Sequence, residues 1–214
     1  MMMQNELISR AAEYVKEKFE NEYSGHDWFH TLRVFKTATR IAEAEGADLV
    51  TVQLAALLHD VDDRKLSPET YENKANARRF LTENKVDDGK TDEICRIIGE
   101  ISFAEKCVPS TLEGKCVQDA DRLDAIGAIG IARAFAYGGN HNRRMYHPDI
   151  APKLNMSKEE YVNSNSTTVN HFYEKLFKLT DMMNTETAKS IARERDAYMK
   201  DFIAEFLNEW EGRK

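Results

Sequence analysis

Apolar side chains recur every three or four positions along most of the chain, which is the spacing of amphipathic helices. This spacing predicts helices over residues 6–20 and 25–46, and we expect Gly46 to end the second helix. Residues 48–58 are apolar on nearly every side, a pattern typical of a helix buried in a protein core. The expected inward faces of the first two helices are Leu7, Ala11, Tyr14, Val15 and Phe19, then Phe29, Val34, Phe35, Ala38, Ile41 and Ala42.

Helical spacing continues through the second half of the chain. It predicts helices over residues 67–83, which a Ser-Pro pair opens, and over residues 91–102 and 116–137. Residues 138–155 have no clear periodicity and predict one long functional or lid-like loop. Helical spacing returns in two later sets, Phe172, Leu176 and Leu179, and then Ile191, Tyr198, Phe202, Phe206 and Trp210. The sequence therefore predicts an all-α fold.

The composition agrees with one folded domain of 214 residues, because 42% of the residues are apolar and 31% are charged. These proportions exclude both a membrane protein and a disordered chain. The longest apolar run, Leu54–Leu58, is far shorter than the roughly 20 residues needed to cross a bilayer. The N-terminus lacks the basic and apolar regions of a signal peptide, so we expect a cytoplasmic protein with no membrane partner.

The charge and the cysteines narrow the classes of partner further. The net charge is -7 and no basic stripe is present, which argues against nucleic acid as a partner. A small anionic substrate is still compatible with this charge, since a metal ion and a few local cations outweigh a distant negative field. Cys95, Cys107 and Cys116 form no CxxC pattern, so we expect buried thiols and neither a disulfide framework nor a thiolate zinc site.

The most apolar segment of the chain runs directly into His59-Asp60-Val61-Asp62-Asp63. Unpaired carboxylates at the end of a buried helix lower the stability of the fold by several kcal/mol each, and a bound cation would offset this loss. Together with His30 and Asp121, the segment offers the imidazoles and carboxylates that suit a divalent first-row metal. Adjacent residues point about 100° apart on a helix, so His59 and Asp60 would converge only where the helix ends. A helical scaffold with internally paired charges stays open as the alternative.

Three segments of the sequence together resemble the HD-domain superfamily of metal-dependent phosphohydrolases, in its small stand-alone bacterial branch. They are Gly25–Val34, Ala55–Asp60 and Asp119–Leu123. The resemblance implies a helical HD-domain bundle over residues 1–214, with a motif core over about 25–131 and C-terminal helices over about 157–212. It also implies that the metal ligands are His30, His59, Asp60 and Asp121.

The resemblance implies one divalent ion, with Mn²⁺ or Mg²⁺ expected and Ni²⁺, Co²⁺ and Fe²⁺ as alternatives. Dinuclear members of the superfamily resemble one another in having extra histidines between the His-Asp doublet and the distal aspartate. No histidine lies between His59 and Asp121, so we expect hydrolysis with one metal ion and not oxygen chemistry.

The resemblance also implies roles for residues that lie near the four ligands in the sequence. Asp63 stands where several family phosphohydrolases place a carboxylate, and on a continued helix it would face the same side as His59. It would orient or deprotonate the attacking water, or alternatively cap a helix or pair with Arg64. Arg33 would meet a substrate phosphate or pair with Asp27. Supporting positions around the ligands are assigned to His26, Asp27, Asp62, Arg122 and Asp124.

Arg143 and Arg144 lie in the predicted loop, where they would bind substrate phosphates or simply form a solvated face. The resemblance implies a phosphohydrolase whose partner is a small phosphorylated molecule, a nucleotide or a related phosphate ester or anhydride. The small stand-alone branch includes enzymes that resemble nucleoside triphosphate pyrophosphohydrolases. A 5'-nucleotidase-type monophosphatase and a regulatory module that senses a nucleotide without turnover are the alternatives. The oligomeric state is left open.

Overall fold

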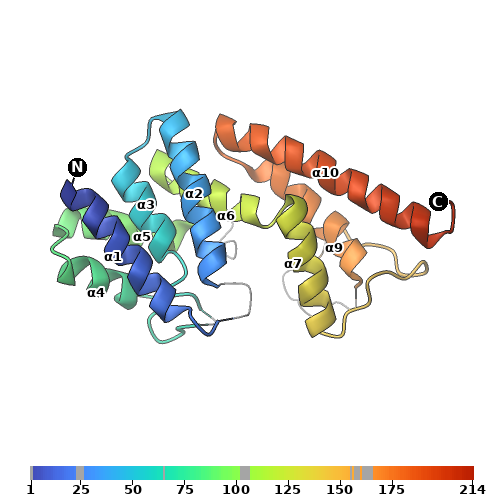
Figure 1. Ribbon diagram of the computed structural model, residues 1–214, viewed down its shortest axis with the longest axis horizontal. Helices are drawn as coiled ribbons and strands as arrows, with labels where there is room; N and C mark the ends of the chain where they lie inside the picture. The colour runs from blue at the N-terminus through green and yellow to red at the C-terminus, as the bar shows by residue number, and fades with distance from the viewer. Residues whose placement is uncertain are drawn as a thin grey trace. The chain divides into compact units, whose positions relative to one another are not determined.

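The computed structural model describes residues 2–22, 27–64, 66–101, 107–154, 156, 160 and 166–214. Helices and turns account for the ordered elements of these residues, and none of them lies in a strand (Figure 1). The all-α prediction is therefore confirmed. The chain divides into two compact units, Met1–Asp121 and Arg122–Lys214, which are described in turn. A single HD domain over the whole length stays a prediction.

The N-terminal unit is built around one buried helix. Its helices are α1 (Met2–Lys18), α2 (Trp28–Glu45), α3 (Leu49–Leu58), α4 (Ala75–Glu83), α5 (Asp88–Glu100) and most of α6 (Leu112–Asp124). Helix α3 packs against α1, α2 and α5 (Figure 1). Its side chains from Thr51 to Leu58, apart from that of Gln53, are buried. The prediction of a core helix over 48–58 is thus confirmed.

Helix α2 begins three residues later than expected and ends at the expected glycine. The Asp27 carboxylate accepts a hydrogen bond from the backbone N–H of His30 at 2.7 Å, which fixes Asp27 as the N-cap. Gly46 ends the helix in the left-handed region with φ 75°. Because the helix starts at Trp28, Phe29 lies on its outer side and is 64% exposed, so its predicted inward placement is wrong.

The predicted helix over 67–83 is shorter in the structure, because α4 begins only at Ala75. The preceding residues form turns, in which the N–H and hydroxyl of Thr70 both donate to the carbonyl of Ser67. Lys74 precedes α4 with φ 52° and offers no side-chain cap. The side chain of Asn73 accepts a hydrogen bond from the first amide of α4, that of Ala75, and the carboxylate of Asp62 accepts hydrogen bonds from the next two. A partner this distant in sequence leaves no local signal.

The predicted helix over 116–137 is interrupted and forms two helices, α6 and α7 (Gly127–Asn140). Gly127 has φ 77°, and a Cβ placed there would lie 2.9 Å from the Cγ of Arg195. A Cβ on Gly130 would lie 2.3 Å from the carbonyl oxygen of Ala125. The glycines of this segment therefore permit a sharp break between two helices, and the prediction of one central helix is wrong.

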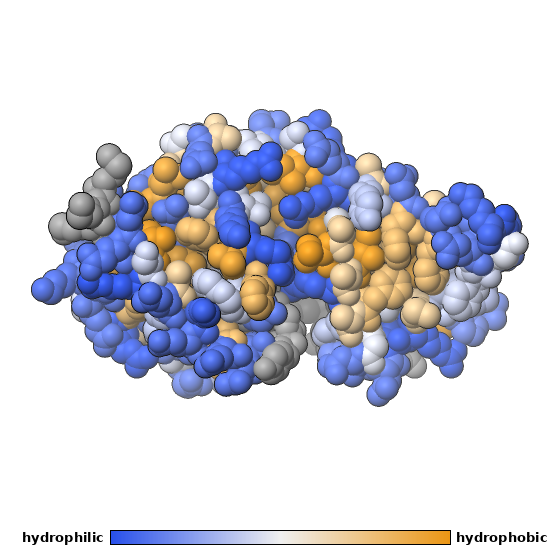
Figure 2. Space-filling view, in the orientation of Figure 1, coloured by the Kyte–Doolittle hydropathy of each residue, from blue (hydrophilic) through white to orange (hydrophobic). Residues whose placement is uncertain are grey.

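The C-terminal unit comprises the end of α6, helix α7, α9 (Thr168–Glu174), the 3₁₀ helix η2 (Leu176–Met182) and α10 (Glu186–Trp210). Helix α10 packs against α7 and η2 (Figure 1). Its buried side chains are Ala188, Ala192, Met199 and Ile203. Of the residues predicted to share one face of this helix, Phe202 and Phe206 are half-buried, whereas Tyr198 and Trp210 are 55% and 47% exposed. Helix α7 also carries apolar residues on its outer face (Figure 2).

The segment after α7 is tied to α9 by hydrogen bonds. The N–H groups of Thr168 and Val169 donate to the carbonyls of Arg144 and Met145, each at 2.9 Å. Further along, the side chain of Asn170 donates to the carbonyl of Ile150 at 2.8 Å. These bonds tie the described part of the segment to α9 within the C-terminal unit, and α7 extends to Asn140, into the start of the predicted loop. The functional or lid-like role of this loop stays a prediction.

The burial of the three cysteines tests the expectation of buried thiols. Cys95 and Cys116 are buried and Cys107 is exposed, so the expectation of buried thiols is wrong for Cys107. Burial raises the pKa of the Cys116 thiol to about 12, with the carboxylate of Asp119 adding to the effect.

Of the helices within the described part of the chain, none combines the length and the apolar character needed to cross a bilayer.

Candidate metal centre

Two histidines of the N-terminal unit are held at the ends of helices. His30 lies in the first turn of α2, where its backbone N–H is bound by the Asp27 cap. His59 directly follows the last residue of α3, and its Nδ1 lies 2.8 Å from the carbonyl oxygen of Ala56. A carbonyl only accepts hydrogen bonds, so Nδ1 of His59 carries the proton and Nε2 presents a lone pair.

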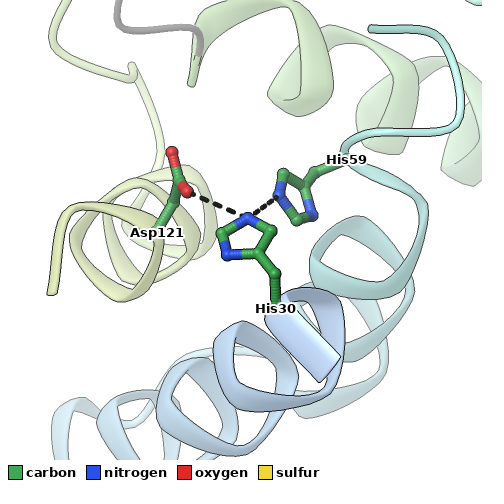
Figure 3. A group of neighbouring side chains, drawn as sticks. All are labelled: His30, His59 and Asp121. Atoms are coloured by element: carbon green, nitrogen blue, oxygen red, sulfur yellow. Dashed lines mark hydrogen bonds and ion pairs between the residues drawn. The ribbon is translucent and has the colours of Figure 1, made fainter. Parts of the chain in front are cut away.

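The two imidazoles meet two carboxylates at one point. The Nε2 atoms of His30 and His59 lie 3.3 Å apart, and Oδ2 of Asp60 lies 3.1 Å from Nε2 of His59 and 3.4 Å from Nε2 of His30. Oδ1 of Asp121 lies 3.5 Å from Nε2 of His30 (Figure 3). One ligand atom each from His30, His59 and Asp121 falls within 4.8 Å of the others. The cluster therefore joins the start of α2, the end of α3 and α6.

His59 and Asp60 converge because α3 has already ended. The N–H of Val61 donates to the carbonyl of Leu58 at 3.3 Å, which closes a tight turn in place of a further helical turn. The turn lets two adjacent side chains point to the same place, which a regular helix would not allow. The prediction that His59 and Asp60 converge only where the helix ends is thus confirmed.

The cluster is buried on most sides. The imidazoles and Asp60 are buried, whereas the side chain of Asp121 is 31% exposed. Burial alone would lower the pKa of His59, but the carboxylates of Asp60 and Asp121 outweigh it and hold this pKa above its ordinary value. The surroundings of His59 thus favour a positive charge at the centre of the cluster.

The donor set fits a divalent ion. Ligands about 2.1 Å from an ion lie about 3.0–3.4 Å from one another in octahedral or tetrahedral geometry. Four distances between donor atoms of the cluster, 3.1–3.5 Å, lie close to these values. Two imidazole nitrogens with carboxylate oxygens also suit a first-row metal. The partial exposure of Asp121 leaves one side of the centre open, as a catalytic metal site requires.

The other two acids of the motif lie in the turn that follows. The carboxylate of Asp62 is buried and bound by backbone amides of α4. Asp63 is half-buried, with its N–H on the carbonyl of Asp60 at 3.0 Å. Because α3 ends at Leu58, the helical spacing that would align Asp63 with His59 is absent and that argument is wrong. The catalytic role of Asp63 stays a prediction.

Two other predicted residues, Asp27 and Arg33, belong to the first turns of α2. Asp27 holds the backbone of His30, which fixes where that side chain begins. Arg33 is half-buried and lies one turn after His30 on the same helix. His26 lies outside the described residues. The substrate contact of Arg33 stays a prediction.

Four predicted residues belong to the C-terminal unit. The guanidinium of the buried Arg122 donates to the carbonyl of Met182, and Arg133 donates to the Asp124 carboxylate at 2.7 Å. The guanidinium of Arg143 lies 5.9 Å from the centre of the Tyr137 ring, and Arg144 is exposed. These contacts lie within that unit, and the predicted substrate and supporting roles stay predictions.

Sequence reasoning missed two contributions to the centre. The Ala56 carbonyl that fixes the His59 ring is a backbone group, which side-chain motifs do not reveal. Asn76 binds the carbonyl of Val61 through its side-chain amide at 3.0 Å, so it supports the turn after Asp60. No local pattern pointed to Asn76, because its partner Val61 lies 15 residues earlier in the chain.

Fold and centre together define the class of protein. The HD domain family profile matches residues 28–126, which include the two histidines and two aspartates of the cluster. YpgQ of Bacillus subtilis (strain 168) is 38% identical over 194 residues, covering 89% of this chain and 87% of YpgQ. The chain belongs to the HD-domain superfamily, and the resemblance seen in the sequence is confirmed.

Solved structures extend this similarity over nearly the whole chain. An HD-superfamily hydrolase from Bacillus thuringiensis has a TM-score of 0.81 at 42% identity, covering 97% of this chain and 98% of that chain. The structure of B. subtilis YpgQ in complex with ADP has a TM-score of 0.78 at 33% identity in the structural alignment, covering 97% and 96%. The protein thus has the fold of an HD-superfamily hydrolase.

Proposed function

We propose that the protein is a metal-dependent phosphohydrolase acting on a nucleotide or a related phosphate ester or anhydride. The observation that carries the proposal is the buried meeting of two imidazole Nε2 atoms with carboxylate oxygens, open to solvent at Asp121. His30, His59, Asp60 and Asp121 would hold one divalent ion, with Mn²⁺ or Mg²⁺ expected and Ni²⁺, Co²⁺ and Fe²⁺ as alternatives. The resemblance to metal-dependent phosphohydrolases of the HD-domain superfamily implies that an ion held by these four ligands takes part in hydrolysis.

When bound, such an ion lowers the pKa of a coordinated water and neutralises charge on phosphate oxygens. The chain's own residues supply the rest. The Ala56 carbonyl fixes the tautomer of the neutral His59 ring, with the lone pair on Nε2, and the Asp27 cap fixes the backbone of His30. Asp63 follows the ligands by three residues and would orient or deprotonate the attacking water. Arg33, one turn beyond His30, would meet a phosphate oxygen.

The nucleotide part of the proposal is supported by the ADP complex of the relative YpgQ. Pyrophosphate release from a nucleoside triphosphate is the favoured reaction, with Arg143 and Arg144 as further phosphate contacts. A 5'-nucleotidase-type reaction is the competing hydrolysis. A nucleotide sensor without turnover is the alternative from another class, and the presence of all four ligands together with Asp63 favours the enzyme.

The test is a panel of nucleoside tri-, di- and monophosphates incubated with Mn²⁺, Mg²⁺ or EDTA, with the products separated by ion exchange. We expect monophosphate plus pyrophosphate from triphosphates with metal, and no turnover in EDTA. Nucleoside plus phosphate would support the nucleotidase instead. Asp60→Asn, which removes a proposed ligand, should abolish this turnover. Asp92→Asn is its matched control, because it removes only an exposed ion pair with Arg78, and it should keep full activity. Nucleotide binding without turnover under every metal would support the sensor.

A further inference from the structure

The turn that follows the predicted metal ligands is fastened to α4 by a bidentate carboxylate. Asp62 is 1% exposed. Its Oδ1 accepts a hydrogen bond from the backbone N–H of Asn76 at 3.0 Å, and its Oδ2 accepts one from the N–H of Ala77 at 2.9 Å. Both oxygens of this carboxylate therefore accept from the first turn of α4, where Asn76 lies 14 residues after Asp62 in the sequence.

The contact also runs in the opposite direction. The side-chain amide of Asn76 donates to the carbonyl of Val61 at 3.0 Å and to the hydroxyl of Thr70 at 2.9 Å. Asp62 thus binds the backbone of Asn76, and Asn76 binds the backbone of the residue before Asp62. We refer to this reciprocal pair of side chains as the Asp62–Asn76 clamp. It resembles a capping box whose two halves come from different segments of the chain.

The clamp fixes one end of a very short segment whose other end is fixed separately. The His59 ring is held by the Ala56 carbonyl, and Val61 and Asp62 are held by Asn76 and Ala77. Asp60 lies between these two points, and its Oδ2 contacts both imidazoles. The helix has already ended at Leu58, so helical hydrogen bonds no longer determine where His59 and Asp60 point. Outer contacts that hold ligands in place commonly set metal affinity.

We propose that Asp62 and Asn76 are positioning residues for His59 and Asp60, and that Asp62 is neither a metal ligand nor a catalytic base. This inference rests on the proposed metal centre. Although Asp62 is an acid of the motif itself, its carboxylate is engaged by two backbone amides and is buried away from solvent. Its contribution to the centre therefore passes through the backbone of residues 60–62.

The test compares Asp62→Ala and Asn76→Ala with Asp87→Ala by calorimetric titration of the metal-free full-length protein with Mn²⁺. Asp87 is the matched control because it caps α5 through the N–H of Lys90 at 3.0 Å, so its loss removes the same kind of bond in the same unit. We expect all three variants to melt at lower temperature. Only the two clamp variants should lose Mn²⁺ affinity, by about 10–100-fold. Asp62→Asn, which keeps one acceptor oxygen, should fall between wild type and Asp62→Ala.

Unchanged Mn²⁺ affinity in folded Asp62→Ala and Asn76→Ala would overturn the inference and leave the clamp as a cap of α4 alone. If Asp62→Ala does not fold, Asn76→Ala decides, because it removes one amide and keeps the bonds of Asp62 to α4. If the wild-type protein binds no divalent ion, the proposed function fails separately. The clamp is then judged by the ¹⁵N signals of His59 in the metal-free protein, which should change in Asn76→Ala and not in Asp87→Ala. Unchanged signals would overturn it.

Discussion

The Nε2 atoms of His30 and His59 lie 3.3 Å apart, although 29 residues separate them in the sequence. The rings meet edge to face, with an interplanar angle of 61°. Nδ1 of His59 donates to the Ala56 carbonyl, so the lone pair of Nε2 points into the gap beside Asp60. Nitrogen lone pairs and carboxylates gathered this closely require a proton or a cation among them. A cation bound among these groups should therefore stabilise the folded protein.

Divalent metal should therefore stabilise the fold. A ligand that binds only the folded state at 100 times its Kd contributes about 2.7 kcal/mol. At roughly 2–4 °C per kcal/mol for a chain of this size, we expect Mn²⁺ to raise Tm by about 5–10 °C relative to EDTA. Thermal melts followed by fluorescence measure this shift, and His59→Ala should abolish it. Identical wild-type melts in Mn²⁺ and EDTA would support the helical scaffold with internally paired charges.

Substitution of Asp63 should separate chemistry from metal binding. Loss of a general base costs typically about 10²–10⁴-fold in rate. We expect Asp63→Asn to lower kcat within this range for the nucleotide that the panel identifies, while Mn²⁺ affinity stays near that of wild type. Steady-state kinetics and calorimetry on the same preparation check both halves. Full activity in Asp63→Asn would remove the proposed base, and a parallel loss of Mn²⁺ binding would make Asp63 part of the metal centre instead.

The break between α6 and α7 gives a prediction on stability. Alanine at Gly127 would take a left-handed conformation at a cost of about 1–2 kcal/mol. Its Cβ would also displace Arg195, whose guanidinium donates to the carbonyl of Leu123. We expect Gly127→Ala to lower the free energy of unfolding by about 2–3 kcal/mol in urea titrations. Gly139→Ala is the matched control, because no atom lies within 4 Å of its Cβ and helix propensity favours alanine. Equal stability of the two variants would contradict the strain at Gly127.

The sequence was most informative where burial alone determines structure. Helix α3 was predicted almost to the residue, because only a helix enclosed on all sides is apolar all round. The same segment made its acidic end conspicuous, and the structure brings His59 and Asp60 together with His30 and Asp121. Composition and the end of one helix pointed to the His59-Asp60 segment, whereas the assignment of all four ligands came from the resemblance to the HD-domain superfamily.

The remaining elements depend on partners far along the chain. The start of α4 is set by Asp62, and the break before α7 is set by the crowding of Gly127 against Arg195. The exposed Tyr198 shows that aromatic spacing alone does not identify the buried face of a helix, since Met199 is the residue that is buried there. Contacts of this kind are tertiary, and a window of neighbouring residues does not contain them.

The C-terminal unit should lose stability in mild acid through His171. Burial, together with the charges of Lys175 and Arg143, lowers the pKa of His171 to about 3. The unfolded chain takes up a proton below about pH 6.5 while the folded protein does not, so the stabilising contribution is present above pH 6.5 and is lost as the pH falls. At pH 5 this loss amounts to about 2 kcal/mol.

Urea titrations at pH 7.5 and pH 5 measure this loss, with His171→Gln as the control that has no titrating ring. We expect the free energy of unfolding to fall by about 2 kcal/mol more in the wild type than in His171→Gln over this range. Arg143→Gln removes one of the two cations that oppose protonation, so its pH dependence should lie between the two. Equal pH dependence in the wild type and His171→Gln would show that His171 is protonated in the folded protein as readily as in the unfolded chain.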